Sequence, residues 1–106
     1  MAKKRPNKKQ RSMMDKMARY GCIACHQDNI YSEAEIHHIR NHTGLALRNH
    51  NKIIPLCAYH HRHGKVSIHL GKKAFIEKYG TEEQLEKKVR ERIEEWDSLT
   101  GIFKYE

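Results

Sequence analysis

The apolar positions in the last quarter of the chain repeat with the period of an α-helix. Spacings of four, four and three residues place one apolar stripe on a single helix face, formed by Leu85, Val89, Ile93 and Trp96. The preceding segment, Thr81–Gln84, has the sequence of a capping box, with acidic residues where the helix dipole favours them. We therefore expect an amphipathic helix after Thr81 that folds back on the rest of the domain.

Two shorter helices are expected elsewhere in the chain. Ser12 has the side chain of an N-cap for a helix that reaches Arg19, with a core-facing side formed by Met13, Met14 and Met17. Gly71 precedes a short segment with apolar residues at helical spacing, Lys72–Lys78, and Gly80 is typical of the residue that ends a helix.

The middle of the chain lacks a helical period and is rich in Cys, His, Asn and Gly. Two short apolar runs, Ala34–Ile39 and Lys52–Leu56, are typical of strands, and the Asn- and Gly-rich segment 41–51 between them is typical of a loop. A helix is expected to open near Ala58. The order strand, loop, strand, helix predicts an α+β fold with a ββα outline and further helices at the C-terminal end.

The composition indicates a single small domain whose hydrophobic core alone supplies too little stability. Of the 106 residues only 38% are hydrophobic, so the chain can bury only a thin core. A bound metal is the usual solution in such a domain, because metal-binding free energy becomes folding free energy. Three cysteines cannot all pair as internal disulfides, whereas three cysteines and one histidine are a common zinc ligand set.

Positive charge is concentrated at the N-terminus. Residues 1–20 carry seven of the eight net positive charges of the chain. We expect residues 1–11 to form a disordered basic tail, ahead of a domain over residues 12–106, and to lie along nucleic-acid phosphates. The basic residues of this tail are Lys3, Lys4, Arg5, Lys8, Lys9 and Arg11. The alternative is a tail that serves only solubility.

Two Cys/His pairs have the spacing of a structural zinc site. Cys22-x-x-Cys25 and Cys57-x-x-His60 each place two residues between ligands, as in zinc knuckles, and together they complete a closed tetrahedral set. Such a set leaves no position for substrate, so this zinc is expected to be structural. The alternatives are buried free cysteines, or a redox-active Cys22-x-x-Cys25, which the lack of a surrounding βαβ pattern disfavours.

A second histidine set is expected to carry the chemistry. On a strand, His37 and His38 face opposite sides, so one can bind a metal ion while its neighbour handles a proton. His38 suits the second task, because an ordinary imidazole with a pKa of about 6.5 accepts a proton near neutral pH. His37 could form an open three-ligand site together with His61 and His69.

An open metal site beside a basic surface suits phosphodiester hydrolysis. The ion, Mg²⁺ or Mn²⁺, would stabilise charge on a phosphate oxygen and on the leaving 3′-oxygen, while His38 takes a proton from the attacking water. Arg40, Arg62 or Lys65 could add positive charge beside the phosphate, or be ordinary surface residues. No role is assigned to the remaining single histidines, His26, His42 and His63.

Taken together, these motifs resemble a known family. The motifs are CxxC, EIHHI, a polar loop, IIPLCxxHH and IHLGKKAFIEKYG. They resemble phage HNH proteins, and in particular the Ref (recombination enhancement function) family of RecA-dependent nucleases. The resemblance covers roughly residues 20–85.

The resemblance implies a ββα-metal fold, also called the HNH or His-Me finger fold. It implies that His38 is the general base, and that His37, His61 and His69 ligate the catalytic ion. It further implies that the DNA to be cut is held by a RecA filament, a partner that nothing in the composition identifies.

The middle letter of the HNH motif is less regular in this chain. HNH proteins commonly place an Asn near the start of the second strand, where it orients the general base through a hydrogen bond. Here the segment Asn49-His50-Asn51 offers three candidates. His50 is favoured, because Ref-like sequences carry a histidine there, and Asn51 is the second choice.

The expected setting is a reducing cytoplasm, that of the bacterial host if the protein is phage-encoded. No stretch approaches the roughly 18 apolar residues that cross a membrane, and residues 1–10 lack the apolar run of a secretory signal. A monomer or weak dimer is expected. The competing functional hypothesis is a non-catalytic zinc module that binds nucleic acid or a recombination protein, which the basic tail and the zinc knuckles would serve equally well.

Overall fold

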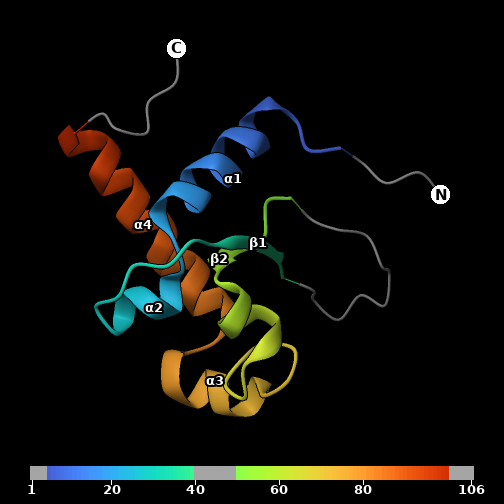
Figure 1. The fold of residues 1–106 in the computed structure, drawn as a ribbon. Helices are drawn as coiled ribbons and strands as arrows, with labels where there is room; N and C mark the ends of the chain where they lie inside the picture. The colour runs from blue at the N-terminus through green and yellow to red at the C-terminus, as the bar shows by residue number, and fades with distance from the viewer. Residues whose placement is uncertain (1–4, 40–49, 101–106) are drawn as a thin grey trace.

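A computed structural model describes residues 5–39 and 50–100 of the chain, with side chains up to residue 98 (Figure 1). The elements follow one another as α1 (Lys8–Tyr20), α2 (Ile23–Gln27), β1 (Glu35–His38), β2 (Ile53–Leu56), the short π-helix η1 (Tyr59–His63), α3 (Lys72–Tyr79) and α4 (Glu82–Thr100). Most of the loop expected over residues 41–51 lies outside the described residues, as do Lys3, Lys4 and Arg40.

The two expected strands form an antiparallel pair. Glu35 lies opposite Leu56 and His37 lies opposite Ile54, so the register is fixed across the pair. The isoleucines and the leucine of β2 are fully buried, as expected for an apolar run that forms the inner strand of the pair. The described chain is thus a small mixed α/β structure in which two strands are followed by a short helix, close to the order expected from the sequence.

Helix α1 begins earlier than expected. Asn7, and not Ser12, is the N-cap: its side chain accepts a hydrogen bond from the backbone N–H of Gln10, and the Gln10 side chain accepts one from the backbone N–H of Asn7, both at 2.8 Å. This capping box satisfies two backbone N–H groups that the first turn of a helix otherwise leaves without partners. Residues 8–11, expected to belong to a disordered tail, therefore form the first turn of a helix, and the expected start at Ser12 was wrong.

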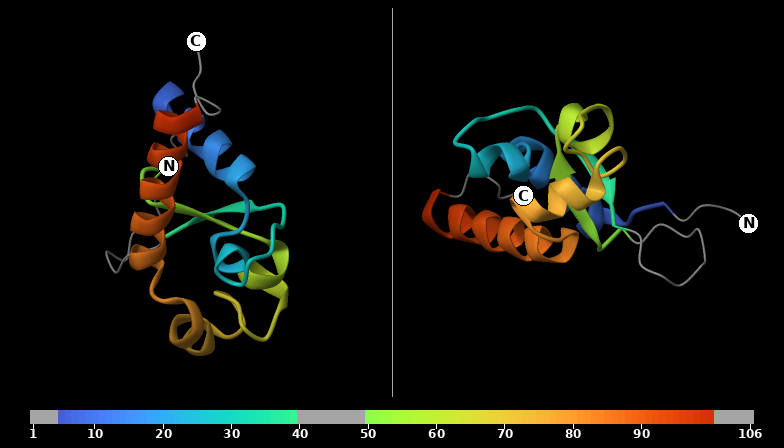
Figure 2. Two further views of the ribbon diagram at one scale, coloured as in Figure 1. Left: turned by 90° about the vertical axis from the view of Figure 1, so that its left-hand side faces the viewer. Right: turned by 90° about the horizontal axis from the view of Figure 1, so that it is seen from below.

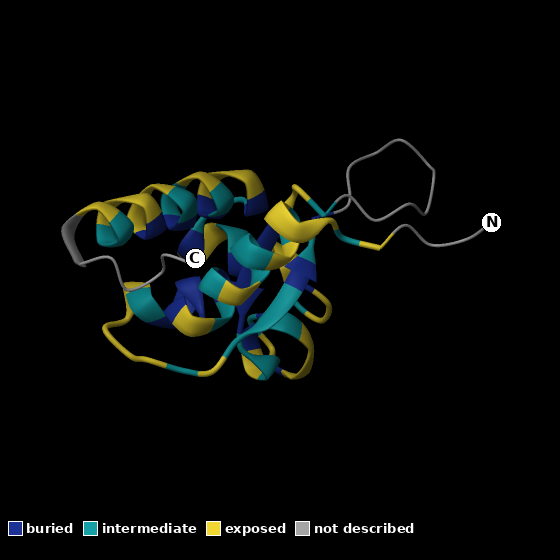
Figure 3. Ribbon diagram, turned by 90° about the horizontal axis from the view of Figure 1, so that it is seen from above, coloured by how far each residue is buried: buried dark blue, intermediate teal, exposed yellow. Residues whose placement is uncertain are grey.

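The C-terminal helix matches its prediction. Thr81 and Gln84 exchange the two hydrogen bonds of a capping box, at 2.8 and 3.1 Å. The apolar stripe of α4 faces inward, with Leu85, Val89 and Ile93 buried, and the opposite face is exposed (Figure 3). The stripe therefore supplies one wall of the core.

The core lies between the hairpin and the two longer helices. Helices α1 and α4 contact each other and both pack against β2 (Figure 2). Met17 and Tyr20 of α1 are buried, and the Tyr20 ring lies 5.1 Å from that of Trp96. Helix α2 was missed because five residues are too few for an apolar period to show. Within the described residues, no helix is both long and apolar enough to cross a membrane.

Candidate metal centres and active site

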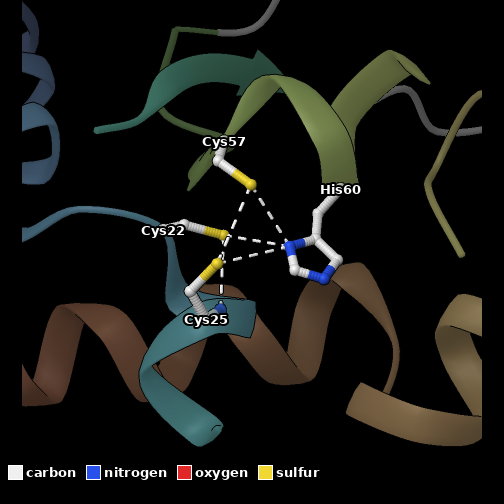
Figure 4. Close-up of side chains that lie close together, drawn as sticks. All are labelled: Cys22, Cys25, Cys57 and His60. Atoms are coloured by element: carbon white, nitrogen blue, oxygen red, sulfur yellow. Dashed lines mark hydrogen bonds between the residues drawn. The ribbon is translucent and has the colours of Figure 1, made fainter. Parts of the chain in front are cut away.

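Three cysteines and one histidine converge where α2 meets the end of β2. Cys22 caps α2 and Cys25 lies on it, while Cys57 follows β2 and His60 lies on η1. The sulfur atoms of Cys25 and Cys57 are 3.8 Å apart, and His60 Nδ1 lies 3.3–3.6 Å from all three sulfur atoms (Figure 4). The four residues that the two knuckle motifs predicted are thus brought together.

These separations are those of ligands on one tetrahedral ion. With Zn–S bonds of about 2.3 Å and Zn–N bonds of about 2.0–2.1 Å, two sulfur ligands lie about 3.8 Å apart and a sulfur lies about 3.5 Å from a nitrogen. Burial raises the pKa of the Cys22 thiol to about 12, so a thiolate there needs a positive charge beside it. A zinc ion would supply that charge, and this cluster could bind a metal such as zinc.

The outer face of His60 is also fixed by hydrogen bonds. His60 Nε2 lies 3.1 Å from the hydroxyl of Tyr79, and that hydroxyl donates a hydrogen bond of 2.8 Å to Asp28 Oδ2. Burial and the neighbouring Asp28 raise the pKa of Tyr79, so the hydroxyl keeps its proton. The hydroxyl is therefore free to accept a hydrogen bond from His60 Nε2–H, which leaves Nδ1 unprotonated toward the sulfur atoms.

A second cluster contains three histidines. One nitrogen from each of His37, His61 and His69 lies within 4.8 Å of the others. His37 is buried, His61 is half-buried and His69 is exposed, so the cluster opens to solvent on the side of His69. The three residues named from the sequence as a metal set are therefore close enough to hold one ion.

Two carboxylates that were given no role from the sequence contact this cluster. Glu82 Oε2 lies 2.5 Å from His37 Nε2, and Glu35 Oε1 lies 2.8 Å from His61 Nδ1. Glu82 had been interpreted only as an acid in the first turn of α4. Its position beside His37 depends on how α4 packs on the hairpin, which no local pattern reveals.

Both carboxylates are ionised in this environment. Burial opposes ionisation of Glu82, but the hydrogen bond from His37 and the nearby Lys72 outweigh it and lower the pKa of the carboxyl. Hydrogen bonds from Arg62 and His61 lower the pKa of Glu35. Two negative charges therefore lie directly behind the histidines.

His38 points away from the three-histidine cluster and meets His50. Its Nε2 lies 3.0 Å from His50 Nδ1, whereas its neighbour His37 contacts His61. The alternation of side chains along β1 thus separates the adjacent histidines, as the strand period predicts. Asn51, the second choice for the contact with His38, accepts a hydrogen bond of 3.1 Å from the Gln10 side chain.

The expected phosphate-binding residues are spread over two regions. Arg5, Lys8, Lys9 and Arg11 are exposed at and before the start of α1. Lys65 is exposed beyond η1, and Arg62 donates two hydrogen bonds to Glu35 beside the three-histidine cluster.

The chain also matches a known family. The model of a family described as recombination enhancement, RecA-dependent nuclease, matches residues 6–94. This range begins just before α1 and includes the Cys/His cluster, the three-histidine cluster and the pair of His38 and His50.

Proposed function

Because the chain belongs to the recombination enhancement, RecA-dependent nuclease family, we propose that it is a metal-dependent DNA endonuclease of the HNH type. It hydrolyses phosphodiester bonds during recombination in the bacterial cytoplasm, and its hairpin with η1 is the ββα-metal unit. The observation that carries this proposal is the separation of His37 and His38 into different clusters, because the reaction needs one imidazole on an ion and another available for a proton.

The geometry of His37 and His61 supports a catalytic ion at the three-histidine cluster. The outward nitrogen of each ring contacts a carboxylate, which can only accept a hydrogen bond, so when both rings are neutral the inward nitrogens face each other as lone pairs. These inward nitrogens lie 3.2 Å apart. Two lone pairs at that distance repel unless a cation lies between them, and a divalent ion such as Mg²⁺ or Mn²⁺ would supply positive charge for the phosphate and the leaving oxygen.

His38 is the proposed general base. If His38 Nε2–H donates its hydrogen bond to His50 Nδ1, the basic nitrogen of His38 is Nδ1, which takes the proton from the attacking water. His50 then holds the ring of His38 in this tautomer and orientation. This contact favours His50 over Asn51 as the residue that orients the base.

The Cys/His cluster is proposed to hold a structural zinc that positions η1. The exposed basic residues at and before the start of α1, together with Lys65 and Arg62, bind DNA phosphates without regard to the base sequence. The part played by a RecA filament as carrier of the DNA is proposed from the name of the family.

A cleavage assay on closed circular and single-stranded DNA tests the proposal. The zinc-loaded protein is incubated with and without added Mg²⁺ or Mn²⁺, each in the presence and absence of a RecA filament. We expect cleavage only when a divalent ion is added, and more cleavage when RecA holds the DNA. DNA binding without cleavage in every condition would instead establish a non-catalytic zinc module.

A further inference from the structure

Two carboxylates contact the three-histidine cluster, and neither takes part in a step of the proposed reaction. Glu82 comes from the first turn of α4, and Glu35 comes from β1, two residues before His37. Each carboxylate contacts the outward nitrogen of one imidazole, at 2.5 and 2.8 Å. The two contacts therefore hold two different rings with carboxylates from two different elements, β1 and α4.

We propose that Glu82 and Glu35 are positioning residues that orient His37 and His61 and set the metal affinity of the cluster. The proposal rests on the metal site assigned under the proposed function. A carboxylate behind a ligating histidine fixes the tautomer and the ring direction, and makes the opposite nitrogen a better donor to the ion. Accordingly His37 carries its hydrogen on Nε2 and binds through Nδ1, whereas His61 carries its hydrogen on Nδ1 and binds through Nε2.

The distance between the inward nitrogens supports this arrangement. Two imidazole nitrogens on one ion, with bonds of about 2.0–2.1 Å, lie roughly 2.9 Å apart at the octahedral angle that Mg²⁺ prefers and roughly 3.3 Å apart at the tetrahedral angle of zinc. The separation of His37 Nδ1 and His61 Nε2 is 3.2 Å. The carboxylates thus hold the two rings at the separation that one shared ion requires.

Each carboxylate is itself held by a cation from a different element. Lys72 Nζ, at the start of α3, lies 3.2 Å from Glu82 Oε1, and Arg62 of η1 donates to both oxygens of Glu35. Glu82 is buried at the N-terminal end of α4, where the helix dipole favours negative charge. The position of the His37 ring therefore depends on Glu82 of α4 and, through it, on Lys72 of α3.

His69 differs from the other two histidines. Over residues 5–39 and 50–98, no carboxylate is found in contact with its imidazole, which is exposed. The two carboxylates therefore orient His37 and His61, and His69 is the member of the cluster that they do not orient.

Metal titration of matched glutamine variants tests the proposal. Protein loaded with one zinc per chain at the Cys/His cluster is titrated with Mn²⁺, and free Mn²⁺ is followed by electron paramagnetic resonance. We expect Glu82→Gln and Glu35→Gln each to weaken Mn²⁺ binding by about 10–100-fold. The controls are the exposed neighbours Glu83→Gln, on the same turn of α4, and Glu33→Gln, just before β1; both should bind as the wild type does.

The tautomers supply a measurement that needs no variant. Long-range ¹H–¹⁵N correlation on the wild type, above the ordinary imidazole pKa of about 6.5, should show His37 protonated at Nε2 and His61 at Nδ1. The opposite tautomers, or Mn²⁺ affinities of both glutamine variants equal to wild type, would overturn this inference and leave the nuclease proposal intact. Failure of the wild type to bind Mn²⁺ at all would overturn the metal site and the inference together.

Discussion

His60 and His61 are consecutive residues of η1, yet their imidazoles lie in different clusters. His60 Nδ1 faces the three cysteine sulfur atoms at 3.3–3.6 Å, whereas His61 Nε2 lies 3.2 Å from His37 Nδ1. One peptide unit therefore joins the two sets. A π-helical turn of this kind is often found at functional sites, and here its consecutive imidazoles belong to different clusters.

Zinc removal should therefore disturb both clusters. Cys57→Ser is expected to lose the zinc and most of the thermal stability, because structural zinc contributes about 10–16 kcal/mol of binding free energy to folding in small domains. Zinc content by mass spectrometry under native conditions and the melting temperature measure the effect, with His63→Ala, an exposed histidine of η1, as the control. A Cys57→Ser protein that melts at the wild-type temperature would mean that the cluster is not a structural metal site.

The hydroxyl of Tyr79 should stabilise the same cluster from outside. Tyr79→Phe removes the group that lies between His60 Nε2 and Asp28, and should lower the free energy of unfolding by about 1–3 kcal/mol, because a buried hydrogen-bonding nitrogen loses its partner. Urea unfolding measures the loss, and zinc should pass faster to a chelator. Tyr59→Phe, at an exposed ring on η1, is the control. Equal stability of the two variants would count against the role of Tyr79.

Much of the site follows from spacing along the chain. The two knuckles predicted the Cys/His set, and the period of two along a strand predicted that His37 and His38 would separate. Both are local rules, since they depend on residues a few positions apart. The capping box before α4 and its apolar stripe were predicted for the same reason.

The residues that sequence reasoning missed depend on how distant segments pack. Glu82 lies 45 positions from His37 in the chain, and its carboxylate reaches that ring only because α4 folds back on the hairpin. The start of α1 was missed for another reason. The basic composition of residues 1–11 indicated disorder, so the capping box that Asn7 and Gln10 form was not predicted.

The basic start of α1 should contribute salt-dependent DNA affinity. Replacing both Lys8 and Lys9 with Gln should lower the slope of log affinity against log salt by up to about 2 for duplex DNA, because each phosphate contact contributes roughly 0.9. Fluorescence anisotropy over a range of salt concentrations measures the slope. The matched control replaces Lys87 and Lys88, a lysine pair on α4, which should leave the slope nearly unchanged. If both double variants lose the same slope, the binding is not directed by α1.

His38 should be required for cleavage and dispensable for folding and metal binding. His38→Ala removes the proposed base, so the cleavage rate should fall by about 10²–10⁴-fold, while zinc content and Mn²⁺ affinity stay at wild-type values because the ring lies outside both metal clusters. His50→Ala should give a smaller loss, since it removes only the group that orients the base. Single-turnover cleavage under saturating Mn²⁺ separates these effects from binding, with His63→Ala as the control. Cleavage by His38→Ala at the wild-type rate would show that another group takes the proton.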